Sequence, residues 1–199
     1  MRIVGGLLRR TPLPLDADRD GLRPTPERVR ATLFDWLGDR VRGARCLDPF
    51  CGTGALGLEA LSRGAASLWL NDRHPGAVAR LRAWLEVRRE ARDERVAAAI
   101  AAVRLTREDA LALLRSAASR GESFDLILLD PPFGGPSPQA LLAAAGAVLA
   151  DEGRLYFEAG QALDEATLAP LSLTLARHGR AGRVHYHLLQ RAAIEPPGP

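Results

Sequence analysis

The chain has 199 residues, of which 47% are hydrophobic, so it can form one domain with a buried core and is not disordered throughout. No apolar run approaches the roughly 18 residues that a membrane-spanning helix needs, and the first residues lack the apolar stretch of a secretory signal. Two cysteines, and four histidines without matching spacing, exclude a disulfide framework and predict no metal site. We expect a soluble, reduced protein of the cytoplasm.

Positive charge is concentrated near the amino terminus. All 27 basic residues are arginines, and residues 1–45 carry a net charge of +4 in a chain whose total is +3. Guanidinium groups bind phosphates bidentately, so this excess suggests a phosphate-rich partner. A solvated arginine surface explains the same counts equally well.

Residues 1–24 consist of short apolar pieces broken by glycines and prolines, which predicts a small β-hairpin extension. A helix is predicted to begin at Thr25-Pro26, with the threonine as N-cap and the proline in the first helical position. Its apolar residues form one buried stripe, which leaves Arg28 and Arg30 on other faces. The tail, residues 192–199, is rich in Pro and Gly and is expected to be disordered.

Strands and helices alternate from about residue 44. Four strands are predicted, each followed by a helix: strands at 45–47, 67–70, 102–105 and 124–129, helices at 54–63, 75–99, 107–120 and 138–150. Three more strands follow at 154–157, 171–176 and 183–189. The last two leave no room for a helix between them, which predicts a terminal antiparallel hairpin. The pattern indicates an α/β fold over residues 25–191, with helices on both faces of a mostly parallel sheet.

Ligands bind at the carboxyl ends of the strands in such a sheet. The first four strands each lead to an aspartate: Asp48, Asp72, Asp109 and Asp130. A single aspartate of this kind is an ordinary turn residue, but four along one edge favour a binding site.

The first aspartate precedes a Gly-x-Gly-x-x-Gly loop formed by Gly52, Gly54 and Gly57, placed between a strand and a helix where a nucleotide binds. A pyrophosphate would be repelled by Asp48. S-adenosylmethionine carries a cationic sulfonium and ammonium and no phosphate, so the loop favours this ligand over NAD. The structural alternative is a tight turn whose glycines serve only packing.

Two later strand ends can complete the cofactor site. Asn71 and Asp72 can hydrogen-bond ribose hydroxyls, or can cap the helix that begins at Pro75. Asp109, before Ala110, can accept from an adenine amino group, or can cap the helix that follows it.

The fourth strand runs into Asp130-Pro131-Pro132-Phe133. Two prolines form a rigid kink without backbone donors, so carbonyl groups face the cleft. An exocyclic amine of guanine or adenine is a poor nucleophile. Hydrogen bonds to the Asp130 carboxylate and the Pro131 carbonyl would hold it toward a methyl donor, with Phe133 stacked on the base. The alternative is a strand terminator followed by a core phenylalanine.

These motifs resemble those of the class I S-adenosylmethionine-dependent amino-methyltransferases. Three further stretches, at 2–6, 21–34 and 54–64, are similar to the bacterial RsmD family, which methylates N2 of one guanine in 16S rRNA. The similarity runs from Arg2 to about Arg191. It implies a Rossmann-like seven-stranded sheet, a monomer, and an assembled or assembling small ribosomal subunit as substrate. It also implies that the Arg-Pro-Thr stretch at 23–25 lies beside cofactor and RNA.

The expected catalytic residues are Asp130, Pro131, Pro132 and Phe133. The expected cofactor-binding residues are Thr25, Asp48, Phe50, Gly52, Gly54, Gly57, Asn71, Asp72, Asp109, Ala110 and Asp130. The expected RNA-binding residues are Arg2, Arg9, Arg10, Arg23, Arg28 and Arg30. Leu70 departs from the family's acid at that position, so the ribose contact falls to Asn71, Asp72 or water. Adenine-N6 methylation of RNA or DNA, glutamine methylation of a protein, and a non-catalytic RNA-binding assembly factor remain alternatives.

Overall fold

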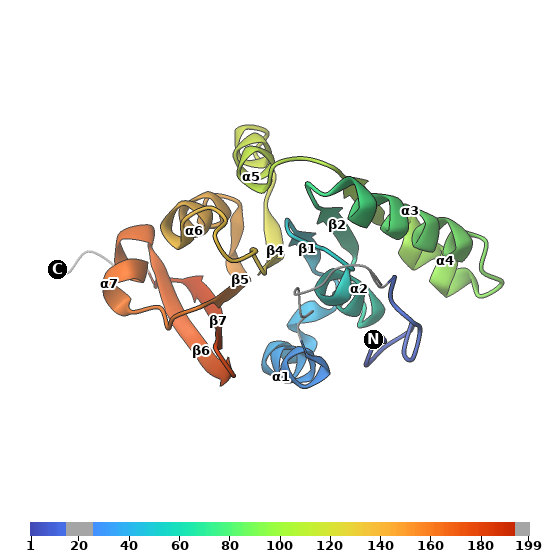
Figure 1. Ribbon diagram of the computed structural model, residues 1–199, viewed down its shortest axis with the longest axis horizontal. Coiled ribbons are helices and arrows are strands. Elements are labelled where there is room, and N and C mark those ends of the chain that lie inside the picture. The colour runs from blue at the N-terminus through green and yellow to red at the C-terminus, as the bar shows by residue number, and fades with distance from the viewer. Residues whose placement is uncertain (15–25, 194–199) are drawn as a thin grey trace.

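The computed structural model describes residues 1–14 and 26–193, and within them a seven-stranded sheet forms the centre of the molecule (Figure 1). The strand order is β3-β2-β1-β4-β5-β7-β6. The strands are β1 (Arg45–Asp48), β2 (Ser67–Asn71), β3 (Val103–Thr106), β4 (Phe124–Leu129), β5 (Leu149–Ala159), β6 (Leu173–Ala181) and β7 (Val184–Arg191). β1 to β5 pair in parallel, whereas β7 pairs antiparallel with both β5 and β6. The predicted α/β sheet and its terminal antiparallel hairpin are confirmed.

Helices cover both faces of the sheet because its strands are apolar on both sides. One face packs against α1 (Glu27–Leu37), α2 (Ala55–Ser62), α3 (Pro75–Arg89) and α4 (Glu94–Ala101). The other face packs against α5 (Ala110–Ser119), α6 (Pro138–Gly146) and α7 (Glu165–Leu168). Two short 3₁₀ helices, η1 (Gly38–Val41) and η2 (Ala169–Leu171), complete the described elements. Adjacent strand residues alternate between the two cores, as Cys46 and Leu47 do.

Helix boundaries differ from the sequence prediction at several points: α5 begins at Ala110 rather than at residue 107, and α6 ends at Gly146 rather than at residue 150, because β5 begins at Leu149. The single helix predicted over 75–99 is divided into α3 and α4, because Asp93 accepts the backbone N–H of Arg95 and starts a new helix. α1 begins at Glu27, with Pro26 in the N-cap position and without a side-chain cap. The predicted cap residue, Thr25, lies outside the described residues, as does the tail from residue 194.

The amino-terminal arm, residues 1–14, doubles back on itself through an antiparallel bridge between Arg2 and Pro12. Its turn packs against the carboxyl end of α2, where the N–H of Leu7 donates to the carbonyl of Ser62 at 2.7 Å. The N–H of Leu8 donates to the Ser62 hydroxyl at 2.8 Å. The remainder of the hairpin predicted over 1–24 lies outside the described residues. No helix within residues 1–14 and 26–193 is long and apolar enough to span a membrane.

A buried ion pair joins the arm to α1 and α2. The Glu59 carboxylate on α2 accepts the backbone N–H groups of Val4 and Gly5 at 2.7 and 2.8 Å, and pairs with Arg30 and Arg63. Arg30 is 0% exposed and also donates to the carbonyl of Arg2. The prediction that Arg30 lies on a solvent face and contacts RNA is therefore wrong. Its cation, together with that of Arg63, offsets the charge of the buried Glu59 carboxylate.

Candidate active site

The carboxyl ends of the parallel strands form one edge of the sheet, which we call the rim. Asp48 ends β1, and Asp72 and Asp130 directly follow β2 and β4. Because β1 lies between β2 and β4, these three aspartates come from neighbouring strands. The strand order also reverses direction between β1 and β4, which is where ligands bind in open α/β sheets. Asp109 follows β3, at the outer end of the same rim.

The glycine loop links β1 to α2 and is held in shape by the next strand. The N–H of Gly52 donates to the Asp72 carboxylate at 2.9 Å, and the N–H of Cys51 donates to the carbonyl of Asn71. Gly52 and Gly54 have φ of +51° and +77°, a region that side chains disfavour. A Cβ on Gly52 would meet nothing within 4 Å, so its face of the loop is open to a ligand.

Gly57 has a different role, because it lets α2 approach the sheet closely. A Cβ there would lie 2.6 Å from Leu70 and 3.1 Å from the Asp48 carboxylate. The N–H of Gly57 donates to one oxygen of that carboxylate at 3.1 Å. The third glycine of the loop is thus a packing position that fixes Asp48 beneath the first turn of α2.

Asp48 is 1% exposed, and its Oδ1 has no hydrogen-bond partner in the described part of the chain. Burial raises the pKa of Asp48 to about 7, and the nearby charge of Asp72 adds to this shift, whereas the backbone N–H groups of Gly57 and Phe50 oppose it. A buried acceptor without a donor is costly unless a ligand supplies one. A cationic ammonium group matches this oxygen in charge and in hydrogen bonding, so the loop fits S-adenosylmethionine.

Asn71 does not face a ligand. It is 0% exposed, and its amide donates to the carbonyls of Pro49 and Glu108 while its oxygen accepts from Thr106 and the Glu108 N–H. The predicted direct contact of Asn71 with the cofactor is wrong, because all of its polar atoms bind the loops around it. It positions those loops instead.

Asp72 and Asp109 are both in contact with backbone groups. The half-buried Asp72 accepts from Gly52 and, through its other oxygen, from the N–H of His74 at 2.8 Å. The exposed Asp109 caps α5 by accepting from the N–H of Ala112, which is the structural alternative for this residue. Ala110, the first residue of α5, is buried. Phe50, beside the glycine loop, is partly buried against the core on the α5 side of the sheet.

The Asp130-Pro131-Pro132-Phe133 segment leaves the end of β4 in a tight turn, in which the N–H of Gly135 donates to the carbonyl of Pro132 at 3.0 Å. Asp130 and the two prolines are half-buried. Phe133 is 77% exposed, so it is not a core residue, and its ring lies near Gly160 at the end of β5. An exposed ring beside a half-buried carboxylate can stack on a base.

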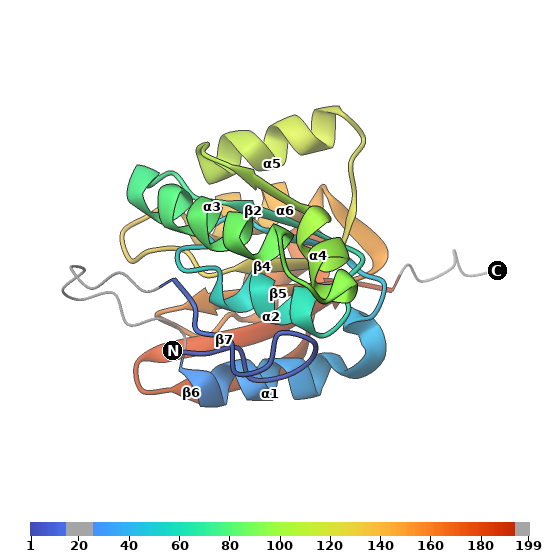
Figure 2. The ribbon, with the colours of Figure 1, turned by 90° about the vertical axis from the view of Figure 1, so that its right-hand side faces the viewer.

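Among the arginines expected to bind RNA, Arg2 links the arm to α1, because its guanidinium donates to the carbonyl of Arg10 at 3.0 Å. Arg28 is exposed at the start of α1, and Arg2, also exposed, donates its N–H to Glu27 there. The exposed Arg9 and Arg10 belong to the turn of the arm, which packs on the end of α2 farthest from the glycine loop (Figure 2). Arg23 and Thr25 lie outside the described residues.

The sequence analysis missed a basic surface on the β6–β7 hairpin. Residues 173–191 hold four arginines and three histidines and no acidic residue, a signal visible in the sequence. Arg180 and Arg183, near the turn, are exposed and form no ion pair within the described residues. Since Ala159 at the end of β5 pairs with His185, the turn extends past the rim (Figure 2).

Three imidazoles stack on this hairpin. The rings of His178 and His185 are 5.2 Å apart and nearly parallel, and His187 stacks on His178 at 4.9 Å. His187 is 0% exposed, accepts from the N–H of Leu163 and donates to the carbonyl of Phe157. Burial lowers the pKa of His187 to about 4, so this ring is neutral at physiological pH.

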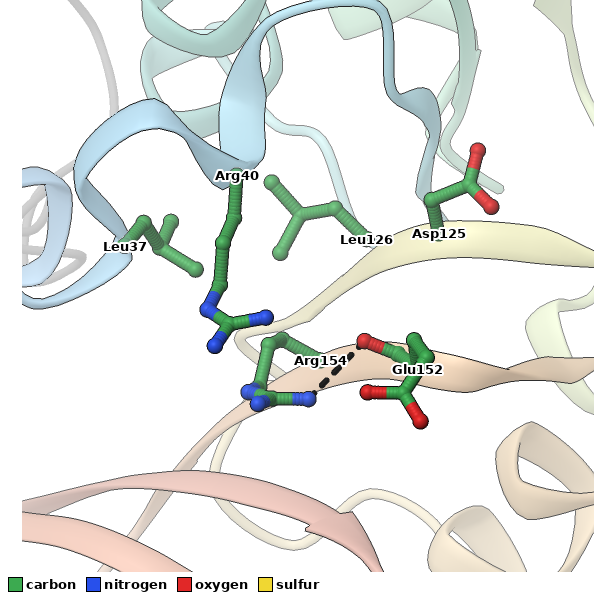
Figure 3. A pocket seen from close by; sticks show the side chains of 6 residues that line it. All are labelled: Leu37, Arg40, Asp125, Leu126, Glu152 and Arg154. Carbon is green, nitrogen blue, oxygen red and sulfur yellow. Dashed lines mark hydrogen bonds between the residues drawn. The ribbon is translucent and has the colours of Figure 1, made fainter.

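A cavity of about 190 Å³ lies away from the rim, near the amino end of β4 (Figure 3). Arg40 and Arg154 extend toward one another in it, and Asp125 and Glu152 line it as well. Asp125 is bound by Arg45 at 2.9 Å. The cavity therefore lies at the end of the sheet opposite the glycine loop. Its lining carries charges of both signs.

The sheet, the glycine loop and the Asp-Pro-Pro-Phe turn together define a class I methyltransferase. The chain belongs to the family described as Conserved hypothetical protein 95, the RsmD family, whose model matches residues 1–190.

Relatives of known name agree with this assignment. Ribosomal RNA small subunit methyltransferase D of Escherichia coli K12 is 36% identical over 195 residues, 97% of this chain and 91% of its own length. The protein of the same name from Haemophilus influenzae is 31% identical, over 96% of this chain and 93% of its own. The solved structure of Escherichia coli protein yhhF aligns with a TM-score of 0.76 and 32% identity, covering 98% of this chain and 99% of that one.

Proposed function

We propose that the protein transfers a methyl group from S-adenosylmethionine to the exocyclic N2 amine of a guanine in 16S rRNA of the small ribosomal subunit. The observation that carries this proposal is the placement of the Asp130-Pro131-Pro132-Phe133 turn on the strand next to buried Asp48. An amine-binding turn and a cation-binding carboxylate thus lie on adjacent strands of one rim. The names of the relatives support ribosomal RNA as the substrate.

The cofactor site is assigned to the glycine loop and the residues beneath it. S-adenosylmethionine, when bound, supplies an electrophilic methyl group on its sulfonium. Asp48 Oδ1 would accept from the ammonium, and the open face of Gly52 would let the ligand touch the backbone. Asp72 keeps a carboxylate at the end of β2 for the ribose, although two backbone N–H groups already bind it. Asp109 and Ala110 would lie at the adenine end.

The target base is assigned to the Asp-Pro-Pro-Phe turn. The N–H groups of the amine would donate to the Asp130 carboxylate and the Pro131 carbonyl, while Phe133 stacks on the ring. Holding two reactants in line can supply roughly 7–11 kcal/mol of the barrier, which removes the need for a covalent nucleophile. The RNA backbone would be bound by exposed arginines, Arg180 and Arg183 on the hairpin past the rim and Arg2 and Arg28 at the start of α1.

The deciding experiment is transfer of labelled methyl groups to small ribosomal subunits from a methylase-deficient strain, followed by nucleoside analysis. We expect N2-methylguanosine as the product. Asp130→Ala should lower turnover on the order of a hundredfold or more while calorimetry shows that cofactor binding is retained. N6-methyladenosine, or label found only in protein, would overturn the guanine assignment. Unchanged turnover in Asp130→Ala would overturn the assignment of this carboxylate.

A further inference from the structure

A second carboxylate, Glu158, lies beside Asp130 at the rim. β4 and β5 pair in parallel with Leu129 opposite Phe157, so the next residues along the two strands, Asp130 and Glu158, are neighbours. Partnered residues of adjacent strands extend to the same face of a sheet. The charges of both residues raise the pKa of Tyr156, with burial the larger cause, which places them around the same hydroxyl.

The surroundings of Glu158 fix its carboxylate as an acceptor. The Tyr156 hydroxyl, two residues earlier on the same face, donates to Oε1 of Glu158 at 2.7 Å. Glu158 is only 8% exposed, and the residue that pairs with it on β7 is Tyr186. The ring of Tyr186 stacks on Trp36, with ring centroids 5.3 Å apart. A carboxylate has about four acceptor positions, so a ligand can share Glu158 with this hydroxyl.

The adjacent carboxylates of Asp130 and Glu158 match the hydrogen-bond donors of guanine better than those of adenine. Guanine presents two kinds of donor side by side, the N1–H and the N2 amine. Adenine presents its N6 amine beside N1, which is an acceptor and would face a carboxylate with no proton between them. Asp130 alone can hold the amine of either base. An added acceptor next to it favours guanine.

We propose that Glu158 is the residue that selects guanine, by accepting the N1–H while Asp130 and the Pro131 carbonyl hold the N2 amine. This inference rests on the proposed function, because it concerns the base that enters the same site. The two carboxylates then have different roles. Asp130 orients the N2 nitrogen that is methylated, and Glu158 recognises guanine by accepting its N1–H.

The test compares small subunits, reconstituted from 16S rRNA, that carry either guanine or 2-aminopurine at the target position, which is mapped by mass spectrometry of nuclease fragments of the labelled RNA. 2-Aminopurine keeps the N2 amine but its N1 is an acceptor. For the unaltered protein we expect kcat/KM to fall about ten- to hundredfold with 2-aminopurine, as for loss of one specific base contact. Equal use of the two bases would overturn the inference without any variant.

Glu158→Gln tests whether the base preference depends on the side chain at position 158, because the new amide can donate to the N1 of 2-aminopurine. We expect its kcat/KM to fall about tenfold or more on guanine, and the preference for guanine over 2-aminopurine to shrink or reverse. Glu152→Gln, an exposed position on the same strand, is the matched control and should keep the original preference. A uniform loss on both bases in Glu158→Gln would indicate a structural role and overturn the inference.

The two proposals fail in different ways. If the unaltered protein methylates no guanine in the subunit, the proposed function is wrong. If it methylates guanine but the base preference of the unaltered protein and of Glu158→Gln is the same, only the role of Glu158 is wrong.

Discussion

One oxygen of Asp48 accepts the N–H of Gly57 at 3.1 Å, while the other is buried without a partner in the described residues. The same contact that holds α2 against β1 thus leaves a buried acceptor at the start of the glycine loop. Burial destabilises the ionised form of the Asp48 carboxyl and raises its pKa to about 7. A cationic ligand would remove that cost.

The affinity for S-adenosylmethionine should therefore increase with pH between about 5 and 7. In the free protein Asp48 holds its proton up to about pH 7, and an ammonium ligand favours the ionised form, so binding releases a proton. Titration calorimetry from pH 5 to 7.5, in two buffers of different ionisation enthalpy, measures both effects. Asp48→Asn should abolish the proton release. Release that persists in this variant would assign the titration to another group.

Gly52→Ala and Gly57→Ala should have opposite consequences. At Gly52 the new methyl meets no atom of the described residues, so the free energy of unfolding should fall only by the roughly 1–2 kcal/mol that an alanine costs in the left-handed conformation. Cofactor affinity should fall strongly. At Gly57 the methyl meets Leu70 and the Asp48 carboxylate, and overpacking should lower the free energy of unfolding by about 1–3 kcal/mol or more. Urea unfolding and calorimetry separate the two. Equal losses of affinity and stability in both variants would contradict these roles.

Arg30→Met should destabilise the fold by about 1.5–3 kcal/mol, because it removes one of the two cations paired with the buried Glu59 carboxylate and the donor to the Arg2 carbonyl. Arg28→Met, two residues earlier but exposed, should change the free energy of unfolding by less than about 0.5 kcal/mol. Urea denaturation of the two variants is the measurement. A stable Arg30→Met protein with weakened RNA binding would restore the surface role that burial contradicts.

Charge reversal can locate the RNA-binding face. Arg180→Glu with Arg183→Glu should weaken binding to small-subunit RNA and reduce the slope of log affinity against log salt by about 1 to 2, as expected for two lost phosphate contacts. Arg40→Glu with Arg42→Glu makes the same charge change just before β1, at the end of the sheet opposite the rim, and should leave the slope nearly unchanged. The reverse result would place the RNA at the end of the sheet opposite the rim.

Local patterns predicted most of the fold. The glycine loop between β1 and α2 was evident because a strand, a turn and a helix follow within a few residues of one another. The terminal hairpin was evident because its strands leave no room for a crossover. The break between α3 and α4 was missed, although Asp93-Glu94 after a charged run is a helix-start signal.

The errors in the site come from contacts between distant segments. Whether Arg30 is exposed depends on Glu59, 29 positions away, which no local pattern reveals. Asn71 was read as a ligand residue because it stands at a strand end, yet the loops at Pro49 and Glu108 occupy its amide. Glu158 was missed because its relation to Asp130 exists only through the register of β4 and β5.

The position of β7 constrains how the chain is made into a protein. This strand is translated after β6, yet it lies between β5 and β6 and supplies all of the backbone pairing of β6 in the sheet. While a nascent polypeptide lacks residues 184–191, β5 exposes an unpaired edge of the kind that invites association with other chains. Until then Glu158 lacks its partner on β7, Tyr186, so the end of the rim at which we propose that the base binds is completed last during biosynthesis.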